Sequence, residues 1–573
     1  MSTLAQEIPT LPTHSVELQP ASGPQRAELT ILLFLCLLGL GFRAWRISTA
    51  GLNHFDEGVY AFSALGLTQP GEPRTLFPGQ AQFSPPVFFS LVGLAYRVFG
   101  GPSDTAAILV NVVLGSLTIP MLWWVGRSWF GAGAGIAAAA LLAFSDFHIL
   151  LSRTALTDAA FAAFFLLSLA AIVAAVRRGS IRFAALAGLA VGLAWNTKYH
   201  GWFALLIGAA AWLALLGFTG VRRQVQPRSL LVWIVMAVTA LLCYLPWLLF
   251  ISSQPGGYEA LARHQWTFLS RAWLHNLIQH AQMQFFFDGW LSRCAIPAAV
   301  LCAVLVSGRR LRATPRFLLI LTSLCISGIL IGGAGAVALL TLFAVPALFR
   351  QRCCYPAWVA LTWLAVWFFS TPLYQPYARL ALPFLVGAYL AAGFWMARAV
   401  ETLRKEHRAA AWQPVLASAA ALGVVATLAA VTSPNSPWRP SRSMWEAASA
   451  MLNLIPRGSP VFVIDEPALA FYLHLAQRPS FERVDGAASL EQVNFPAYVV
   501  TGFYAKRAPR TRQDLQKLAG RLTPLGTFSM DPNDVRLMDD LAPRDARRFR
   551  SQADDAYHLT LYRLAPAPAR SGG

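Results

Sequence analysis

The sequence is poor in charged residues for a chain of its length. Asp, Glu, Lys and Arg together make up 13% of its 573 residues, whereas hydrophobic residues make up 56%. A soluble domain of this size needs many more polar residues to cover its surface. The composition therefore excludes an ordinary soluble globular protein and indicates a polytopic α-helical membrane protein.

Several common sequence signatures are missing as well. All seven cysteines occur at or before Cys354, so the C-terminal part has no disulfide framework. The chain contains no P-loop, no Rossmann glycine fingerprint and no zinc-type cluster of Cys and His. These absences argue against a nucleotide as a direct substrate. They also leave no motif from which a cofactor can be identified with certainty.

Long apolar segments recur along the chain, and the longest reach the ~20 residues that a helix needs to cross a bilayer. A shorter apolar segment at 85–100 is expected to lie at the membrane surface or to re-enter the membrane. We predict about 13 transmembrane helices, near 29–47, 104–126, 132–150, 157–176, 183–198, 200–218, 229–252, 294–308, 315–333, 334–349, 355–371, 378–397 and 412–432.

The net charge of +19 is best explained by membrane orientation rather than by nucleic-acid binding. Basic residues gather in short turns between apolar segments, and one alternation of sides places all of these turns in the cytoplasm. We therefore predict a multi-pass protein of a bacterial-type inner membrane, with a cytoplasmic N-terminus and an extracytoplasmic C-terminal part. The turns are Arg127, 177–182, 222–228, 309–316, 350–352 and 404–408.

This orientation divides the chain into a cytoplasmic tail (1–28), a membrane domain (29–432) and an extracytoplasmic α/β domain (433–573). The membrane domain has two long outer loops, at 48–103 and 253–293, and we expect one amphipathic interfacial helix over 263–282 in the second. In the α/β domain, hydrophobic periodicity predicts helices at 443–456 and 468–477 and strands at 459–467, 496–504 and 557–564.

Charged side chains mark several of the predicted outer turns, where an unpaired charge at the membrane boundary is costly. Asp56, Asp158, Lys198 and Arg379 all occur in such turns. A sugar carried on a polyprenyl phosphate would present its phosphate at this level of the membrane. Attack by an acceptor hydroxyl needs a base, for which Asp56 and Asp158 are candidates. Lys198 and Arg379 are candidates for stabilising the departing phosphate.

The same segments resemble a known family. The stretches "DEGVYAF" (56–62), "FSPPVFFSL" (83–91) and "SRTALTDAAFAAFF" (152–165) are similar to those of membrane glycosyltransferases of the GT-C class. The closer resemblance is to the superfamily of protein O-mannosyltransferases and lipid A aminoarabinose transferases (glycosyltransferase family 39-like), over residues 30–400. It implies a glycosyltransferase fold, a polyprenyl-phosphate donor and an extracytoplasmic C-terminal domain.

The resemblance also implies roles for individual residues. Asp56 is expected at the reaction centre, with Asp158 as a second catalytic carboxylate. Further residues match the family pattern and are expected to bind substrate: Glu57, Tyr60, Lys198, Tyr377 and Arg379. The family further implies a single displacement that inverts the anomeric carbon.

One motif departs from the family pattern. Aminoarabinose transferases carry Glu-Lys directly before the Pro, whereas this chain has Phe83 and Ser84. The departure argues against an aminoarabinose transferase proper and against a tightly bound metal at this place. A divalent cation held by Asp56, Glu57 and Asp158 remains an open alternative.

Each of these residues also has a simpler interpretation. Asp56 and Glu57 can cap an interfacial helix, and Asp158 can cap the next membrane helix. Lys198 can extend to the membrane surface, and Tyr377 can belong to an interfacial aromatic belt.

The sequence thus predicts an enzyme that transfers a sugar from a polyprenyl-phosphate carrier to a hydroxyl of a glycolipid, polysaccharide or protein, in contact with membrane lipids and without nucleic acid. The alternatives are a polytopic transporter or flippase, which would bind its solute near the membrane midplane, and a non-catalytic scaffold.

Overall fold

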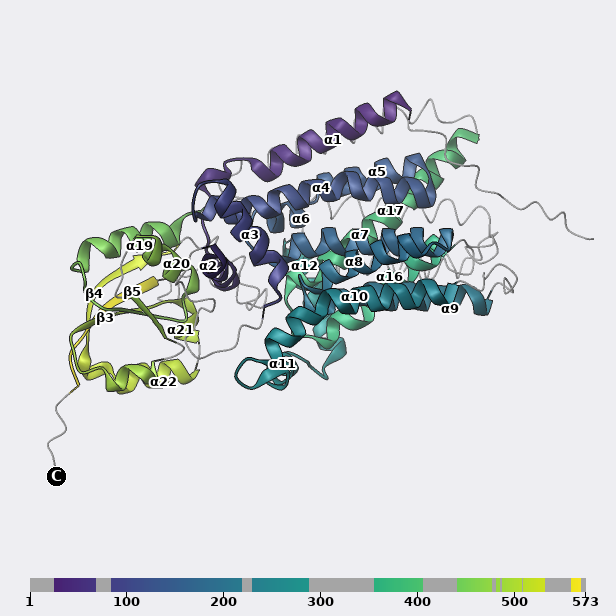
Figure 1. The fold of residues 1–573 in the computed structure, drawn as a ribbon. Helices are drawn as coiled ribbons and strands as arrows, with labels where there is room; N and C mark the ends of the chain where they lie inside the picture. The colour runs from purple at the N-terminus through teal and green to yellow at the C-terminus, as the bar shows by residue number, and fades with distance from the viewer. Residues whose placement is uncertain are drawn as a thin grey trace, which may run out of the picture.

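Two parts of the molecule are distinguished in Figure 1, a bundle of long helices and a small α/β domain at one end of it. Helices α2 (Phe55–Thr68) and α3 (Pro86–Val98) lie between them. The computed structural model describes residues 25–68, 84–218, 229–287, 355–405, 441–476, 481–484, 487–507, 509–530 and 558–567.

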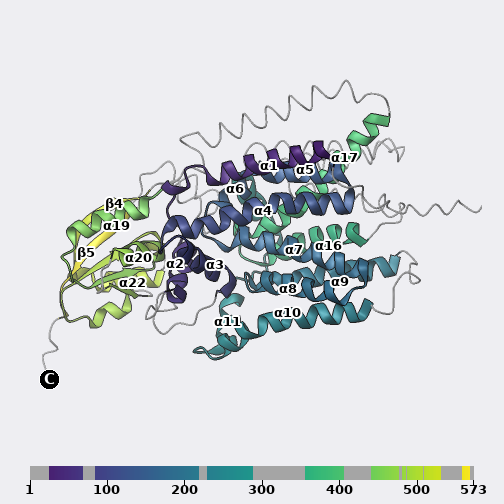
Figure 2. The same ribbon diagram turned by 45° about the horizontal axis from the view of Figure 1, so that its top comes forward.

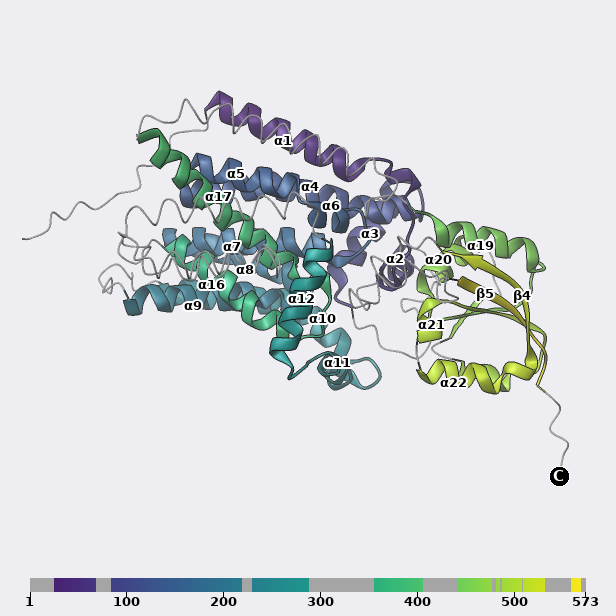
Figure 3. The same ribbon diagram turned by 180° about the vertical axis from the view of Figure 1, so that it is seen from behind.

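The helices of the bundle alternate in direction, and Figure 3 shows from behind how α12 and α16 complete it. Where the structure describes the turns that the charge pattern assigns to the outer side, they lie at the end that carries the α/β domain. The helices are α1 (Arg26–Ala44), α4 (Asp104–Phe130), α5 (Ala132–Ala143), α6 (Asp146–Ser152), α7 (Thr157–Arg178), α8 (Ile181–Trp195), α9 (Phe203–Phe218), α10 (Ser229–Ser252), α11 (Gly257–Trp266), α12 (Trp273–Phe287), α16 (Tyr355–Ser370) and α17 (Leu382–Lys405).

Seven of the described helices are long and apolar enough to cross a membrane, or up to eight if the bent pair α5–α6 is one span. The predicted polytopic α-helical fold is thereby confirmed. The total of about 13 spans stays a prediction, because four predicted segments lie outside the described residues: 294–308, 315–333, 334–349 and 412–432. The apolar segment at 85–100 forms α3, whose 13 residues are too few to span a bilayer as a straight helix.

The span predicted at 132–150 is broken, with a bend of 62° between α5 and α6. Buried Arg43 donates hydrogen bonds to the carbonyls of Leu142 (3.2 Å) and Ala143 (3.4 Å), the last two residues of α5. The hydroxyl of Ser145 accepts the backbone N–H of His148 at 3.2 Å and so caps α6. The backbone groups exposed by the break are thus partly satisfied inside the protein, as a break at membrane depth requires.

The single amphipathic helix predicted over 263–282 is wrong, because α11 ends at Trp266 and α12 begins at Trp273. The residues between them pair with the chain before α17. The N–H of Ser270 donates to the carbonyl of Leu373 at 2.9 Å, and that of Gln375 donates to the carbonyl of Phe268 at 2.8 Å. This extended pairing joins residues about 100 positions apart and replaces the helix. The periodicity of hydrophobic residues within 263–282 could not predict it, because the pairing partner lies elsewhere in the sequence.

In the described part of the α/β domain, five strands form a mixed sheet with the order β2-β1-β3-β5-β4. The central strands β1 and β3 are parallel, and β5 runs antiparallel to both β3 and β4. Its elements are α19 (Ser443–Leu454), β1 (Val461–Ile464), α20 (Pro467–Leu475), β2 (Phe481–Val484), β3 (Ala497–Thr501), α21 (Phe503–Arg507), α22 (Pro509–Lys517), β4 (Leu522–Ser529) and β5 (His558–Leu564).

Alternation along β1 explains the two layers that cover this sheet. Val461 and Val463 belong to the core that α19 and α20 share, whereas Phe462 and Ile464 belong to the core on the opposite face. The helices α19 and α20 and the strands β1, β3 and β5 confirm the sequence predictions. The sequence analysis missed β2 and β4; Pro524 and Gly526 interrupt the strand pattern of β4, which tolerates them as an edge strand with a bulge.

Candidate active site

Four charged residues from distant parts of the chain form two ion pairs at the end of the bundle that carries the α/β domain. Arg379 Nη2 lies 2.7 Å from Asp56 Oδ2, and Lys198 Nζ lies 2.5 Å from Asp158 Oδ1. The charges of Arg379 and Lys198 both act on Asp56, and the charges of Asp56 and Asp158 both act on His54. The structure therefore brings together both predicted catalytic carboxylates and both predicted phosphate-binding cations.

Asp56 is held at the start of α2, as the second residue of that helix. Its backbone N–H donates to Nδ1 of His54 at 3.0 Å, so the imidazole takes the place of a capping side chain. A carboxylate in the first turn is favoured by the helix dipole. The Asp56 side chain is 30% exposed, which leaves it the more accessible of the two paired carboxylates.

Nearby charges set the ionisation of Asp56 and His54. Burial acts to raise the pKa of Asp56, but the Arg379 guanidinium and the other nearby cationic groups outweigh burial and hold this pKa below its ordinary value. Burial, followed by the charge of Arg379, lowers the pKa of His54 to about 4. His54 is thus neutral near pH 7, with Nδ1 as the acceptor and the proton on Nε2.

Asp158 occupies the equivalent place in a membrane helix, as the second residue of α7. Its side chain is only 2% exposed, and Oδ2 has no hydrogen-bond partner among the described residues. Lys198 reaches it from the turn after α8. The amide of Asn196 fixes that turn by donating to the carbonyls of Gly192 (2.9 Å) and Cys243 (3.0 Å).

Glu57 binds backbone N–H groups with both of its carboxylate oxygens. Its Oε2 accepts the backbone N–H groups of Asn53 and His54, both at 2.9 Å, and its Oε1 accepts that of Ala155 at 2.8 Å. The side chain therefore closes the first turn of α2 and ties it to the turn before α7. These contacts support a positioning role for Glu57, and its predicted contact with substrate stays a prediction.

Tyr60 and Tyr377 both lie near residues of this cluster. The Tyr60 ring packs edge-on against Phe88 of α3, with centroids 5.5 Å apart. The Arg379 guanidinium lies 5.8 Å from the ring centre of Tyr377. Tyr377 also neighbours Phe268 and Tyr374, whose rings stack at 5.5 Å.

Sequence reasoning missed three residues around the ion pairs: His54, Phe268 and Tyr374. His54 directly precedes the acidic pair, and that adjacency was the one available signal for it. Phe268 and Tyr374 come together only through the pairing of 268–270 with 373–375. Neither segment contains a local sequence pattern that predicts this pairing.

The cluster shows no arrangement typical of a metal centre. Among the residues that the structure describes, no group of three His, Cys, Asp or Glu side chains is placed to hold a metal ion. Asp56 and Asp158 face cations, and both oxygens of Glu57 accept backbone hydrogen bonds. The donor set therefore does not fit the divalent cation considered for these three residues.

Comparison with protein families finds a match over part of the chain. Residues 84–250 match the family described as Dolichyl-phosphate-mannose-protein mannosyltransferase. These residues form a domain of that GT-C glycosyltransferase family. The match includes Asp158 and Lys198 and begins after Asp56. It confirms the family resemblance drawn from the motifs. No curated protein matches the chain by sequence.

Solved structures show a similar fold over most of the chain. The archaeal oligosaccharyltransferase AglB from Archaeoglobus fulgidus, in complex with an inhibitory peptide and a dolichol-phosphate, is 16% identical at a TM-score of 0.56; the match covers 88% of this chain and 73% of that one. ArnT from Cupriavidus metallidurans, bound to undecaprenyl phosphate, is 17% identical over 96% of this chain and 98% of its own, at a TM-score of 0.44. The likeness to AglB, which covers 88% of this chain, shows that the chain has a GT-C fold.

Proposed function

We propose that this protein transfers a glycosyl unit from a polyprenyl-phosphate carrier to an acceptor hydroxyl. The observation that carries the proposal is the pair of carboxylate–cation contacts, Asp56 with Arg379 and Asp158 with Lys198, at one end of the helical bundle. Two carboxylates can serve proton transfer and hydroxyl binding, and two cations can hold a phosphate. The family of residues 84–250, whose description names a dolichyl-phosphate sugar, supports the same donor class.

Asp56 is the proposed base. The acceptor oxygen attacks the anomeric carbon and loses its proton to Asp56, while the bond from that carbon to the phosphate oxygen breaks. The polyprenyl phosphate leaves with the electron pair, and its charge is stabilised by Arg379 and Lys198. Asp158 orients Lys198 and binds the sugar or the acceptor. A single displacement of this kind inverts the anomeric carbon.

Arg379 links donor binding to the strength of the base. While it pairs with Asp56, it keeps the pKa of that carboxylate low, which makes Asp56 a weak base. A phosphate that draws the Arg379 guanidinium away removes part of this effect and raises the pKa of Asp56. The base therefore becomes stronger only when the donor is in place.

The proposed setting is the outer face of a bacterial-type inner membrane, with the α/β domain outside. Two of the Arg-rich turns, Arg127 and 177–182, are among the described residues, and both lie at the end of the bundle opposite the α/β domain, which supports this orientation. The structure of AglB with a dolichol-phosphate shows that a fold of this kind can accommodate a lipid phosphate. The acceptor is a hydroxyl of a lipid, polysaccharide or protein.

A transfer assay in liposomes tests the proposal. The purified protein is reconstituted with radiolabelled polyprenyl-phosphate sugars and an extract of the host envelope, beside Asp56→Asn at matched expression and folding. Glu259→Gln is the matched control, because Glu259 is an exposed carboxylate of α11 that pairs with Arg263 within its own helix.

We expect label to move to an acceptor with the wild type and with Glu259→Gln but not with Asp56→Asn. Equal transfer by all three proteins would remove Asp56 from the mechanism. Uptake of a solute into the vesicles without any transfer would favour the transporter alternative instead.

A further inference from the structure

The segment that leads into α2 is held by the α/β domain. The N–H of Gly51 donates to the carbonyl of Ser441 at 2.8 Å, and the N–H of Leu52 donates to the hydroxyl of Tyr472 at 2.7 Å. The N–H of Phe55 donates to the hydroxyl of Tyr504 at 3.3 Å. Three backbone N–H groups within five residues of Asp56 therefore donate to the C-terminal part of the chain. Their partners lie at least 390 positions further along the sequence.

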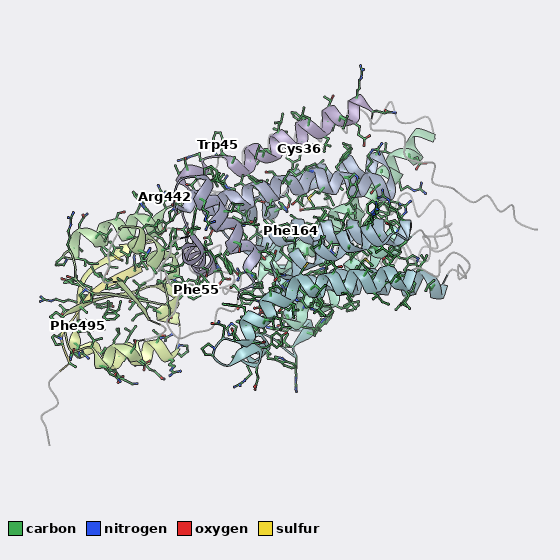
Figure 4. The ribbon with its side chains drawn as sticks, viewed as in Figure 1. Cys36, Trp45, Phe55, Phe164, Arg442 and Phe495 are labelled. Carbon is green, nitrogen blue, oxygen red and sulfur yellow. The ribbon has the colours of Figure 1, made fainter. Side chains whose placement is uncertain are left out.

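Packing supports the same contact. One hydrophobic core runs from α2 and α3 into α19 and α20, and Figure 2 shows α2 beside α20. At Gly58, a Cβ atom would lie 2.2 Å from the backbone nitrogen of Ala468, so only glycine allows α2 to come this close to α20. The rings of Phe55 and Tyr504 meet edge-on at 5.0 Å, and Figure 4 shows Phe55 and Arg442 at the junction of the two parts.

Tyr472 connects this segment to the membrane helices as well. While its hydroxyl accepts from Leu52, it donates to Oδ2 of Asp104 at 3.1 Å. Asp104 is the first residue of α4, and its Oδ2 also accepts from Arg442 at 2.9 Å. One buried hydroxyl therefore joins α20, the segment before α2 and the start of a membrane helix.

We propose that Tyr472 and Tyr504 are positioning residues, and that the α/β domain serves to hold Asp56 against Arg379. The domain fixes the backbone of 51–55 from one side, and Glu57 fixes the same turn from the other through Ala155. The carboxylate of Asp56 then has little freedom to leave its partner. This inference rests on the proposed function for its effect on rate, but the contact itself is testable without any substrate.

The experiment uses the full-length protein in nanodiscs with Tyr472→Phe, Tyr504→Phe and the double variant. Tyr562→Phe is the matched control, because Tyr562 packs on the opposite face of the same sheet. Hydrogen exchange of the amides in 51–58 reports the contact, and kcat, the KM values for donor and acceptor, and the pH profile of transfer report its consequence. Size-exclusion elution and thermal unfolding confirm that each variant is folded.

We expect Tyr472→Phe to speed exchange at Leu52 and to lower kcat, each about tenfold, because a buried N–H and the Asp104 carboxylate both lose a partner. The donor KM should change less than about twofold. The acid limb of the pH profile should move to higher pH as Asp56 loosens from Arg379. Tyr562→Phe should match the wild type in every measurement.

Three outcomes overturn the proposal. The first is unchanged exchange in 51–58 in the double variant. The second is faster exchange with an unchanged kcat, which separates the contact from the chemistry. The third is a raised acceptor KM with unchanged kcat and exchange, which makes the domain an acceptor-binding module. If the wild type shows no transfer at all, the proposed function fails, while the exchange data still decide whether the tyrosines hold the segment.

Discussion

Helices α2 and α7 both have an aspartate as their second residue, but the two aspartates differ in how deeply they are buried. Asp56 and Asp158 are each the second residue of their helix, and each pairs with a cation from a distant turn. Asp158 is 2% exposed at the start of a helix long enough to span a membrane, whereas Asp56 is 30% exposed in a shorter helix outside the bundle. Burial suits Asp158 for orienting Lys198, and access suits Asp56 for exchanging a proton with substrate.

Replacing each carboxylate by its amide separates these roles most strongly. Asp56→Asn should lower kcat by about 10²–10⁴-fold, the typical contribution of a general base. Asp158→Asn should raise the donor KM more than it lowers kcat, since it mainly releases Lys198. Initial rates at varied donor concentration measure both effects. A larger loss of kcat in Asp158→Asn than in Asp56→Asn would reverse the two assignments.

Glu57→Gln tests what ties the two helix starts to each other. The amide nitrogen of Gln would face a backbone N–H in place of one carboxylate oxygen, so a buried donor loses its acceptor. We expect a loss of about 1–3 kcal/mol in the free energy of unfolding. Thermal or denaturant unfolding in detergent measures it, with Glu259→Gln on the exposed face of α11 expected to change stability by less than about 0.5 kcal/mol.

Exchanging the two kinds of cation tests the geometry of each pair. Arg379→Lys keeps the charge but removes the planar fork, so we expect the donor KM to rise about tenfold. Lys198→Arg should have a smaller effect if Lys198 acts as a point charge. Donor titration of both variants against the wild type decides this. Equal KM values for Arg379→Lys and the wild type would contradict a forked contact between Arg379 and the phosphate.

The hydrogen bonds from the segment before α2 to the α/β domain predict a modest effect of pH on that segment. Burial raises the pKa of Glu466 to about 8, and its Oε1 accepts the N–H of Tyr504 at 2.9 Å. Because this pKa lies above the ordinary value of 4.5, the folded protein binds more protons than the unfolded chain between these values. The stability that protonated Glu466 contributes at low pH is therefore lost as the pH rises from about 4.5 to about 8.

Exchange in 51–58, corrected for its intrinsic pH dependence, should rise a few-fold between pH 6 and pH 9, while exchange at the start of α7 stays constant. Glu466→Gln should abolish the rise, because its amide does not ionise. The same rise in Glu466→Gln would show that another group titrates at this junction.

The sequence predicted the helical bundle, most strands of the α/β domain and the identity of the paired charges. Helices were accessible because apolar runs and alternation are local properties of the chain. Pro524 and Gly526 obscured β4, which is a local cause. The break after Trp266 has a distant cause, because residues 268–270 pair with 373–375. The role of Glu57 was not accessible, because three backbone N–H groups from two separate turns converge on its carboxylate.

By itself, the sequence determined that this chain is a polytopic membrane protein with acidic and basic side chains in the turns at one end of its helices. Hydropathy and the position of Arg and Lys are sufficient for that, since the cost of burying charge in a bilayer acts on each segment separately. Only the tertiary structure decided which charge meets which, and that the α/β domain holds the segment before Asp56. Some of those contacts join residues more than 400 positions apart. They depend on how the helices pack rather than on any local pattern.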